Sequence, residues 1–234
     1  MKSITLTHKG KRKVNQDVIL TRNIGSDINL FIVADGMGGY DNGEVAAKMA
    51  CESILTFLSN IDVINQDTIQ KAVNKANLAV RQFQEQNNSK MGTTLGAVVL
   101  SKGKAKCFWV GDVKVFHYSS NKLLFESQSH NLLNELLESD IVNENFKSSK
   151  YRHIVTRSIQ GGDIKKSVIS YQELIVKAKD ELIICSDGVH SIIDSHTVLC
   201  LMKSEQTDFI NKLNDRLEKE ANDNASLIYV SEFN

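Results

Sequence analysis

The chain has 234 residues, and its 28 lysines and arginines balance 28 aspartates and glutamates, so the formal net charge is zero. This length fits one domain or two small ones, and 41% apolar against 24% charged residues is typical of a soluble globular protein. The neutral balance argues against a general nucleic-acid or anionic-membrane binder, and every apolar run is far shorter than the roughly 20 residues of a membrane span.

Short strands rich in β-branched and apolar residues open the chain, and two helices follow. The strands are expected at residues 3–7, 18–22 and 29–34, and the helices at 44–58 and 67–86. In the second helix an apolar residue recurs every three or four positions from Ile69 to Phe83, which predicts one buried face. We expect Asp67 to cap this helix, with Gln70 completing a capping box.

The middle of the chain changes to β-structure. Segments joined by short turns predict a meander of antiparallel strands, at residues 93–100, 104–110, 114–119 and 122–127. A helix over 129–138 and a polar, irregular stretch over 140–150 are expected next. The last third is expected to hold strands at 154–158, 167–173, 181–185 and 226–230 and helices at 195–202 and 208–220. Strands at both ends with an early helix pair favour two packed sheets covered by helices over alternating βαβ units.

Aspartates stand next to apolar strands at four places. Asp35 and Asp187 each follow an expected strand and precede a glycine. Asp112 follows another strand, and Asp223 lies just before the last one. Any single Asp-Gly is more often a simple turn, but several carboxylates brought together repel one another unless a cation lies between them. All-oxygen ligands of this kind suit Mg²⁺ or Mn²⁺, so the set predicts a divalent metal site.

A run of basic residues near the start contains a further candidate. Arg12 lies in the run 9–13 and precedes Asp17 by five positions. Such a run is most often a solvated surface, but beside a metal site an arginine offers a planar fork that binds phosphate oxygens.

Two other phosphate-handling classes are excluded by their motifs. None of the four cysteines is followed six residues later by an arginine, as a cysteine-based phosphatase requires. A GxxxxGK[ST] phosphate-binding loop is also absent from the sequence.

Six motifs taken in order resemble one known family. RKVNQD, VADGMGG, MGTTL, VGDVK, CSDG and DNAS are similar to the successive motifs of the PP2C (PPM) metal-dependent protein serine/threonine phosphatases, in their bacterial form. The resemblance covers about residues 3–231. It implies an α+β fold with a central β-sandwich of two antiparallel sheets flanked by helix pairs, in four α/β/β/α layers. It also implies that residues 1–234 form a single catalytic domain.

The resemblance implies a metal-binding role for each matching acid. Asp35 corresponds to the aspartate that bridges two Mn²⁺ or Mg²⁺ ions, and the carbonyl of Gly36 to a ligand of one of them. Asp187 and Asp223 correspond to the other ligands of the first ion. Asp112, together with Asp187, corresponds to the residues that hold a third, weaker ion.

The resemblance also implies the reaction. Asp17 corresponds to the acid that holds metal-bound water, and Arg12 to the phosphate-binding arginine. Phosphoserine and phosphothreonine would be hydrolysed by a hydroxide between the two ions, without a phosphoenzyme. Gln16 stands where many members carry Glu, and Met37 where animal enzymes carry a histidine. Because neither change removes a carboxylate ligand, an active enzyme is the favoured hypothesis.

Two alternatives remain open, and the partners are expectations of the family. The chain could be the phosphatase of an anti-sigma-antagonist-type regulator, or a catalytically silent module that binds phosphoproteins. We expect phosphorylated protein substrates, a cognate Ser/Thr kinase, and no nucleic-acid or membrane partner. The absence of a secretory signal and of a CxxC pair favours a cytoplasmic protein in signalling, expected as a monomer. Residues 129–166 correspond to the variable flap, which usually shapes specificity.

Overall fold

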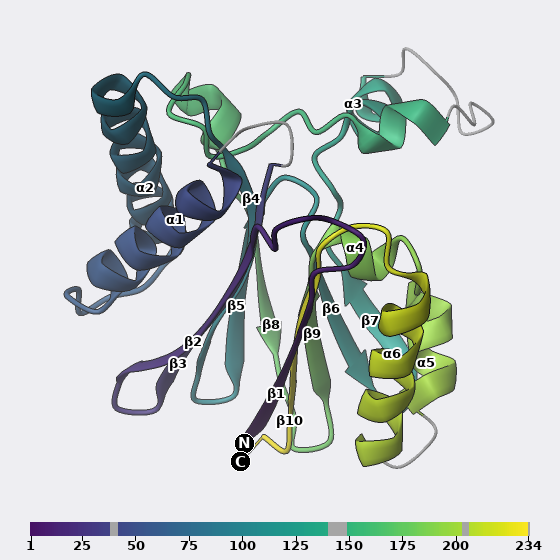
Figure 1. The fold of residues 1–234 in the computed structure, drawn as a ribbon. Helices are drawn as coiled ribbons and strands as arrows, with labels where there is room; N and C mark the ends of the chain where they lie inside the picture. Colours follow the sequence, from purple (N-terminus) through teal and green to yellow (C-terminus); the bar gives the residue numbers. More distant parts are fainter. Residues whose placement is uncertain (38–41, 140–148, 203–205, 234) are drawn as a thin grey trace.

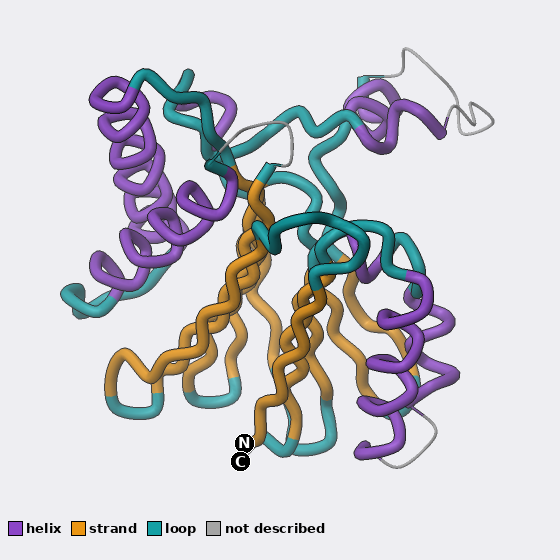
Figure 2. The backbone as a smooth tube through the Cα atoms, viewed as in Figure 1, coloured by secondary structure: helices purple, strands orange, loops and turns teal. Residues whose placement is uncertain are grey.

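The structure is a computed structural model, and it describes residues 1–37, 42–139, 149–202 and 206–233. Two antiparallel five-stranded sheets pack face to face, with helices on both outer sides (Figures 1 and 2). In the first sheet the order is β1 (Lys2–His8), β10 (Ala225–Ser231), β9 (Glu181–Cys185), β6 (Lys114–Ser119) and β7 (Lys122–Glu126). In the second it is β2 (Asp17–Gly25), β3 (Ile28–Gly36), β4 (Thr93–Ser101), β5 (Lys104–Val110) and β8 (Ser170–Ile175).

Helix pairs form the two outer layers. The second sheet is covered by α1 (Gly43–Leu58) and α2 (Gln66–Asn87), and the first by α5 (Ser195–Met202) and α6 (Gln206–Glu220). The remaining elements are α3 (Leu132–Glu138), α4 (Asp187–His190) and the 3₁₀ helices η1 (Ser149–His153) and η2 (Ile164–Ser167). The four-layer α+β sandwich that the resemblance implied is thus confirmed. Among the described residues, no helix has the length and apolar character that crossing a membrane requires.

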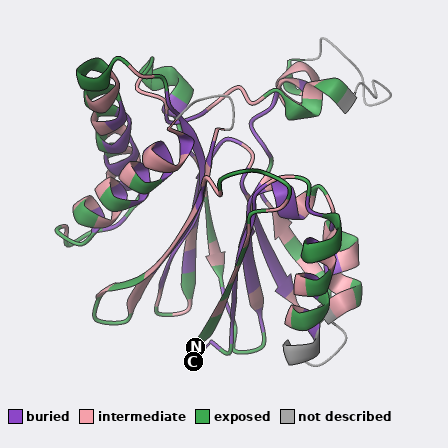
Figure 3. Ribbon diagram, in the orientation of Figure 1, coloured by how far each residue is buried: buried purple, intermediate pink, exposed green. Residues whose placement is uncertain are grey.

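Strand β3 shows how one strand serves two hydrophobic layers. Leu30, Ile32 and Ala34 pack under α1 and α2. Phe31 and Val33 pack into the layer between the sheets. Successive side chains of a strand point to opposite faces, so a strand buried on both sides is apolar at every position. A third apolar layer joins the first sheet to α5 and α6, and the inner surfaces of all four layers are buried (Figure 3).

The predicted four-strand meander is wrong. Strand β4 pairs with β5 and β6 pairs with β7, but β5 and β6 belong to different sheets. The joint between them contains Gly111, whose φ of 101° allows the sharp change of direction. Local patterns could not reveal this crossing, because strands of either sheet show the same apolar character.

Other parts of the chain also differ from the predictions. Residues 154–158 form no strand, only an isolated bridge of Val155 to Asn131. Strand β8 begins at Ser170 instead of 167, because η2 occupies the preceding residues. Helix α3 begins three residues later than predicted, where the side chain of Asn131 accepts a bond from the Asn134 N–H at 2.9 Å. Most of the polar stretch 140–150 lies outside the described residues.

The cap of α2 also differs. Asn65, and not Asp67, caps the helix, and its Oδ1 accepts a bond from the Thr68 N–H at 2.9 Å. The Thr68 hydroxyl in turn accepts from the Asn65 N–H at 2.8 Å, which completes a capping box two positions earlier than predicted. Gln70 instead bonds to Asn74 in the next turn.

Gly96 of β4 packs closely against the side chain of Val113, which lies in the joint between the two sheets. A Cβ added there would lie 2.5 Å from Cγ1 of Val113 and 3.5 Å from Cγ2 of Ile184. Because overpacking a core typically costs about 1–3 kcal/mol, we expect Gly96→Ala to lower the free energy of unfolding by about that amount. Urea denaturation in the presence of EDTA measures it.

Gly162 offers a matched control, since nothing lies within 4 Å of a Cβ added there. Gly162→Ala should leave the stability nearly unchanged. Adding Val113→Ala to Gly96→Ala should recover part of the loss, because it removes the clashing methyl groups. Equal stability of the two alanine variants would contradict this close approach of the sheets.

Candidate metal and phosphate site

Two of the predicted acids come from neighbouring strands of the second sheet. Asp17 opens β2 and Asp35 lies near the end of β3, and the two residues are directly opposite each other in the antiparallel pair. Residues paired in this way project from the same face of the sheet. Alternation places Asp35 with Phe31 and Val33, on the face between the two sheets. Both carboxylates are therefore directed toward the first sheet.

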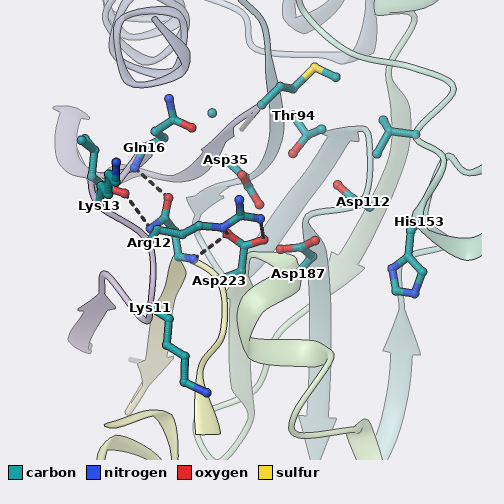
Figure 4. A pocket seen from close by; sticks show the side chains of 15 residues that line it. Lys11, Arg12, Lys13, Gln16, Asp35, Thr94, Asp112, His153, Asp187 and Asp223 are labelled. Carbon is teal, nitrogen blue, oxygen red and sulfur yellow. Dashed lines mark hydrogen bonds and ion pairs between the residues drawn. The ribbon is translucent and has the colours of Figure 1, made fainter. Parts of the chain in front are cut away.

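The other acids come from the first sheet and from the joint between the sheets. Asp187 follows β9, and Asp223 precedes β10, which pairs with β9. Asp112 lies in the joint from β5 to β6. Figure 4 shows Asp35, Asp112, Asp187 and Asp223 turned toward a common space. The structure thus brings together the predicted acids from segments far apart in the chain.

These acids form the floor of a cavity of about 750 Å³. Lys11, Arg12 and Lys13 line one wall, and His153 of η1 lines the other (Figure 4). A cavity of this size and polarity can admit a phosphorylated side chain together with part of its surroundings.

Four of the acids have raised pKa values, and burial is the largest cause at each of these four. It raises the pKa of Asp17 to about 6 and, with the charge of Asp187, that of Asp112 to about 7. The pKa of Asp35 lies well above its usual range because of burial and the charges of Asp17 and Asp187. Burial and Asp223 raise the pKa of Asp187. The cluster therefore lacks positive charge, which a divalent cation would supply.

The donor atoms also suit such an ion. Oδ1 of Asp17 is buried, and no described residue gives it a hydrogen bond. Within the described ranges, however, no three His, Cys, Asp or Glu side chains converge as a ready metal site. Both oxygens of Asp223 instead accept bonds from Arg12, at 2.7 Å from Nε and 2.6 Å from Nη2. The guanidinium supplies the positive charge at Asp223 in this arrangement.

Gly36 occupies a position that only a glycine fits. A Cβ added there would lie 2.5 Å from the Gly43 carbonyl oxygen and 2.6 Å from that of Gln16. The backbone beside Asp35 is thereby held close to the start of α1. Residues 38–41 of the predicted glycine-rich loop lie outside the described residues.

Asn224 holds the loop that carries Arg12, a role that sequence reasoning missed. Its Nδ2 donates to the carbonyls of Lys9 and Val14 at 2.9 and 3.0 Å. Its Oδ1 accepts from the backbone N–H of Gln16 at 2.9 Å. These bonds attach the loop on both sides of Arg12. Only the position of Asn224 directly after Asp223 could have drawn attention to it, since its partner Gln16 lies 208 residues earlier.

Ser186 orients Asp17 and was also missed. Its hydroxyl donates to Oδ2 of Asp17 at 2.9 Å and accepts from the Ser226 backbone N–H at 2.9 Å. This places one buried hydroxyl between the two sheets, where it fixes the carboxylate of Asp17.

His130 supports the joint that contains Asp112. Its ring Nδ1 accepts a hydrogen bond from the Gly111 backbone N–H at 3.0 Å, and the backbone N–H of His130 donates to the Gly111 carbonyl at 2.8 Å. Burial, and then the charge of Arg157, lower the pKa of His130 to about 4. The ring is therefore neutral at pH 7, as an acceptor at Nδ1 requires.

Known proteins match this chain over most of its length. The family model for protein phosphatase 2C matches residues 6–227. The serine/threonine phosphatase stp of Listeria monocytogenes is 28% identical over 191 residues, covering 76% of this chain and 73% of that protein. A serine/threonine phosphatase structure from S. agalactiae has a TM-score of 0.88 at 23% identity, covering 99% of both chains. The catalytic domain of the phosphatase PstP, solved with two manganese ions, has a TM-score of 0.80 at 20% identity, covering 97% of this chain and 96% of that one.

Proposed function

This chain belongs to the protein phosphatase 2C family, and we propose that it hydrolyses phosphoserine and phosphothreonine in proteins with the help of two divalent ions. It is a serine/threonine protein phosphatase, so its substrates are phosphoproteins. The observation that supports metal-dependent hydrolysis is that four acids line one cavity and that the pKa values of three of them, Asp35, Asp112 and Asp187, are raised. We propose Mn²⁺ or Mg²⁺ as the ion, and a PP2C-type structure that holds manganese supports the choice.

The resemblance to the family divides the acids between the ions. Asp35, Asp187 and Asp223 would hold the first ion, and Asp35 with the carbonyl of Gly36 the second. Asp112 and Asp187 would hold a third, weaker ion. When bound, such ions lower the pKa of a water molecule and neutralise charge on the phosphoryl oxygens. Because the two sheets both contribute ligands, we propose that residues 1–234 act as one catalytic domain.

Other residues of the chain position the reactants. Asp17 is oriented by Ser186, whose hydroxyl donates to its Oδ2, and it would accept a hydrogen bond from water held at the ions. Arg12 binds the phosphoryl oxygens with its planar guanidinium. To do so it releases the carboxylate of Asp223, with which it is paired in the structure. Met37 lines the cavity and cannot donate a proton, so the leaving oxygen takes its proton from water.

Hydrolysis of p-nitrophenyl phosphate tests the proposal. Turnover with Mn²⁺ or Mg²⁺ that EDTA abolishes is expected. Phosphopeptide binding without turnover at any divalent ion would instead favour the silent binding module. A phosphatase for an anti-sigma-antagonist-type regulator would share the same chemistry, and only a comparison of phosphoproteins with and without the gene separates it. The kinase, the monomeric state and the cytoplasmic location remain predictions.

Arg12→Ala should mainly raise the KM for p-nitrophenyl phosphate. Hydrogen bonds to charged groups contribute about 1.5–3 kcal/mol, so the expected increase is about tenfold or more, with a smaller change in kcat. Arg12→Lys should give an intermediate KM, because it keeps the charge and loses the fork. Arg81→Ala, which removes only an exposed pair with Glu85, is the control. An unchanged KM with a large loss of kcat would exclude a role in phosphate capture.

A further inference from the structure

Two lysines flank Arg12 on the wall of the cavity, and none of the steps above uses them. Lys11 and Lys13 both line the cavity (Figure 4). All three basic residues are exposed. Because the net charge of the chain is zero, this concentration of positive charge is a local property of the cavity mouth.

The lysine charges are not neutralised within the protein. Arg12 is paired with Asp223, but Nζ of Lys11 donates to the neutral side-chain oxygen of Asn222 at 2.8 Å. Lys13 makes no ion pair with any residue that the structure describes. The acids on the floor do not compensate these charges, since in the proposed function they face bound cations. Lys11 is thus held in place at the mouth, and its charge remains available.

The opposite wall contributes His153. This exposed residue lines the cavity from η1, whereas Lys150 and Arg152 of the same short helix are exposed outside the lining. A polypeptide bound over the acidic floor would pass between the lysines and η1.

The size of the cavity extends the contact beyond the phosphate. A volume of about 750 Å³ lies in the upper part of the range of about 300–1,000 Å³ for ligand pockets. The cavity therefore has room for residues beside the phosphorylated one as well as for the phosphorylated side chain itself. Residues that neighbour the phosphorylated one would then lie against the lysines. We propose that this rim selects phosphoproteins in which acidic residues flank the phosphorylated residue. The inference rests on the proposed phosphatase function and names its substrate class.

Three phosphothreonine peptides that differ only in flanking Glu, Gln or Lys residues test it. We expect kcat/KM for the Glu peptide to exceed that for the Gln peptide about threefold to tenfold, as two exposed ion pairs allow. Raising the salt from about 50 mM to about 500 mM should reduce the ratio, because exposed charges are screened. Lys13→Glu should bring the ratio of the Glu peptide to the Gln peptide close to one, because the new carboxylate offsets the charge of Lys11. Ratios within one variant cancel any general effect on the chemistry.

Lys179→Ala is the matched control. This exposed lysine precedes β9 at the end of the strand opposite to Asp187, and its removal should leave the preference of the parent protein intact. Equal kcat/KM for the Glu and Gln peptides at low salt in the parent protein, or an undiminished ratio in Lys13→Glu, would overturn the inference.

Turnover of p-nitrophenyl phosphate by the parent protein separates the two proposals. If it is hydrolysed while the peptides show no charge preference, the phosphatase function stands and the rim inference fails. If nothing is hydrolysed, the phosphatase function fails, and fluorescence anisotropy of the same labelled peptides still measures the preference. Tighter binding of the Glu peptide than of the Gln peptide would then support the rim, and equal binding would refute it.

Discussion

Asp35→Asn is expected to abolish turnover and, at the same time, to stabilise the metal-free fold. The residue lies at the centre of the acid cluster, and the charges of Asp17 and Asp187 help to raise its pKa. Loss of residues that only support metal ligands costs about 10–100-fold in affinity or activity, so loss of a shared ligand should cost more than roughly 100-fold. Asparagine has nearly the same shape and carries no charge, so it removes the repulsion at this position.

Two measurements are needed for this variant. Hydrolysis of p-nitrophenyl phosphate with saturating Mn²⁺ gives the loss of turnover. Urea denaturation in EDTA near pH 8 gives the gain in the free energy of unfolding, because the substitution removes a carboxyl group whose pKa burial and neighbouring charges raise. Asp187→Asn should abolish turnover for the same reason.

Asp27→Asn is the control for both measurements. Asp27 is exposed in the turn between β2 and β3, at a φ of 58° that asparagine also tolerates, so activity and stability should not change. Near-parental turnover of Asp35→Asn would show that the assignment of Asp35 is wrong. Lost turnover together with lower stability would point to misfolding instead of a missing ligand.

Without metal, the buried acids should contribute less to stability as the pH rises from about 4 to about 7. The folded-state pKa values of Asp17 and Asp112 are raised to about 6 and about 7, and those of Asp35 and Asp187 are raised as well. An unfolded aspartate has a pKa of about 3.9, so in this window these acids bind more protons in the folded state than in the unfolded state. Their contribution to the free energy of unfolding therefore falls with rising pH, whereas a buried histidine such as His130, with a pKa lowered to about 4, contributes in the opposite direction.

Mn²⁺ should reverse this dependence. The ion binds ionised carboxylates, so its stabilising effect should be larger at pH 8 than at pH 5, and at 100 times its Kd it amounts to about 2.7 kcal/mol. Urea denaturation at the two pH values, with Mn²⁺ or with EDTA, measures both effects. In EDTA, Asp112→Asn should gain stability relative to the parent protein as the pH rises. A constant difference between the two proteins at pH 5 and pH 8, or an equal gain from Mn²⁺ at both pH values, would contradict a buried cluster of uncompensated acids.

Much of the fold was predictable because local patterns carry it. The helix that contains Ile69 and Phe83 was expected from its period, and the ends of β5, β6 and β9 were predicted to the residue. The cap at Asn65 was misplaced because Asn and Asp serve equally as caps, and the residues on both sides of Gln66 offer one of each. Residues 154–158 were misassigned because their β-branched residues favour a strand. In the described part of the structure, only Asn131 pairs with this segment, through an isolated bridge to Val155.

By itself, the sequence determined which acids are the candidates for the chemistry, since each stands beside an apolar strand within a motif that resembles those of the family. Only the tertiary structure decided how they meet. The crossing between sheets at Gly111, the pair of Arg12 with Asp223 and the bonds from Asn224 to the loop that carries Arg12 join residues of different sheets or of opposite ends of the chain. Periodicity reports only which face of an element is buried, whereas such contacts depend on how the buried faces of distant elements pack against one another.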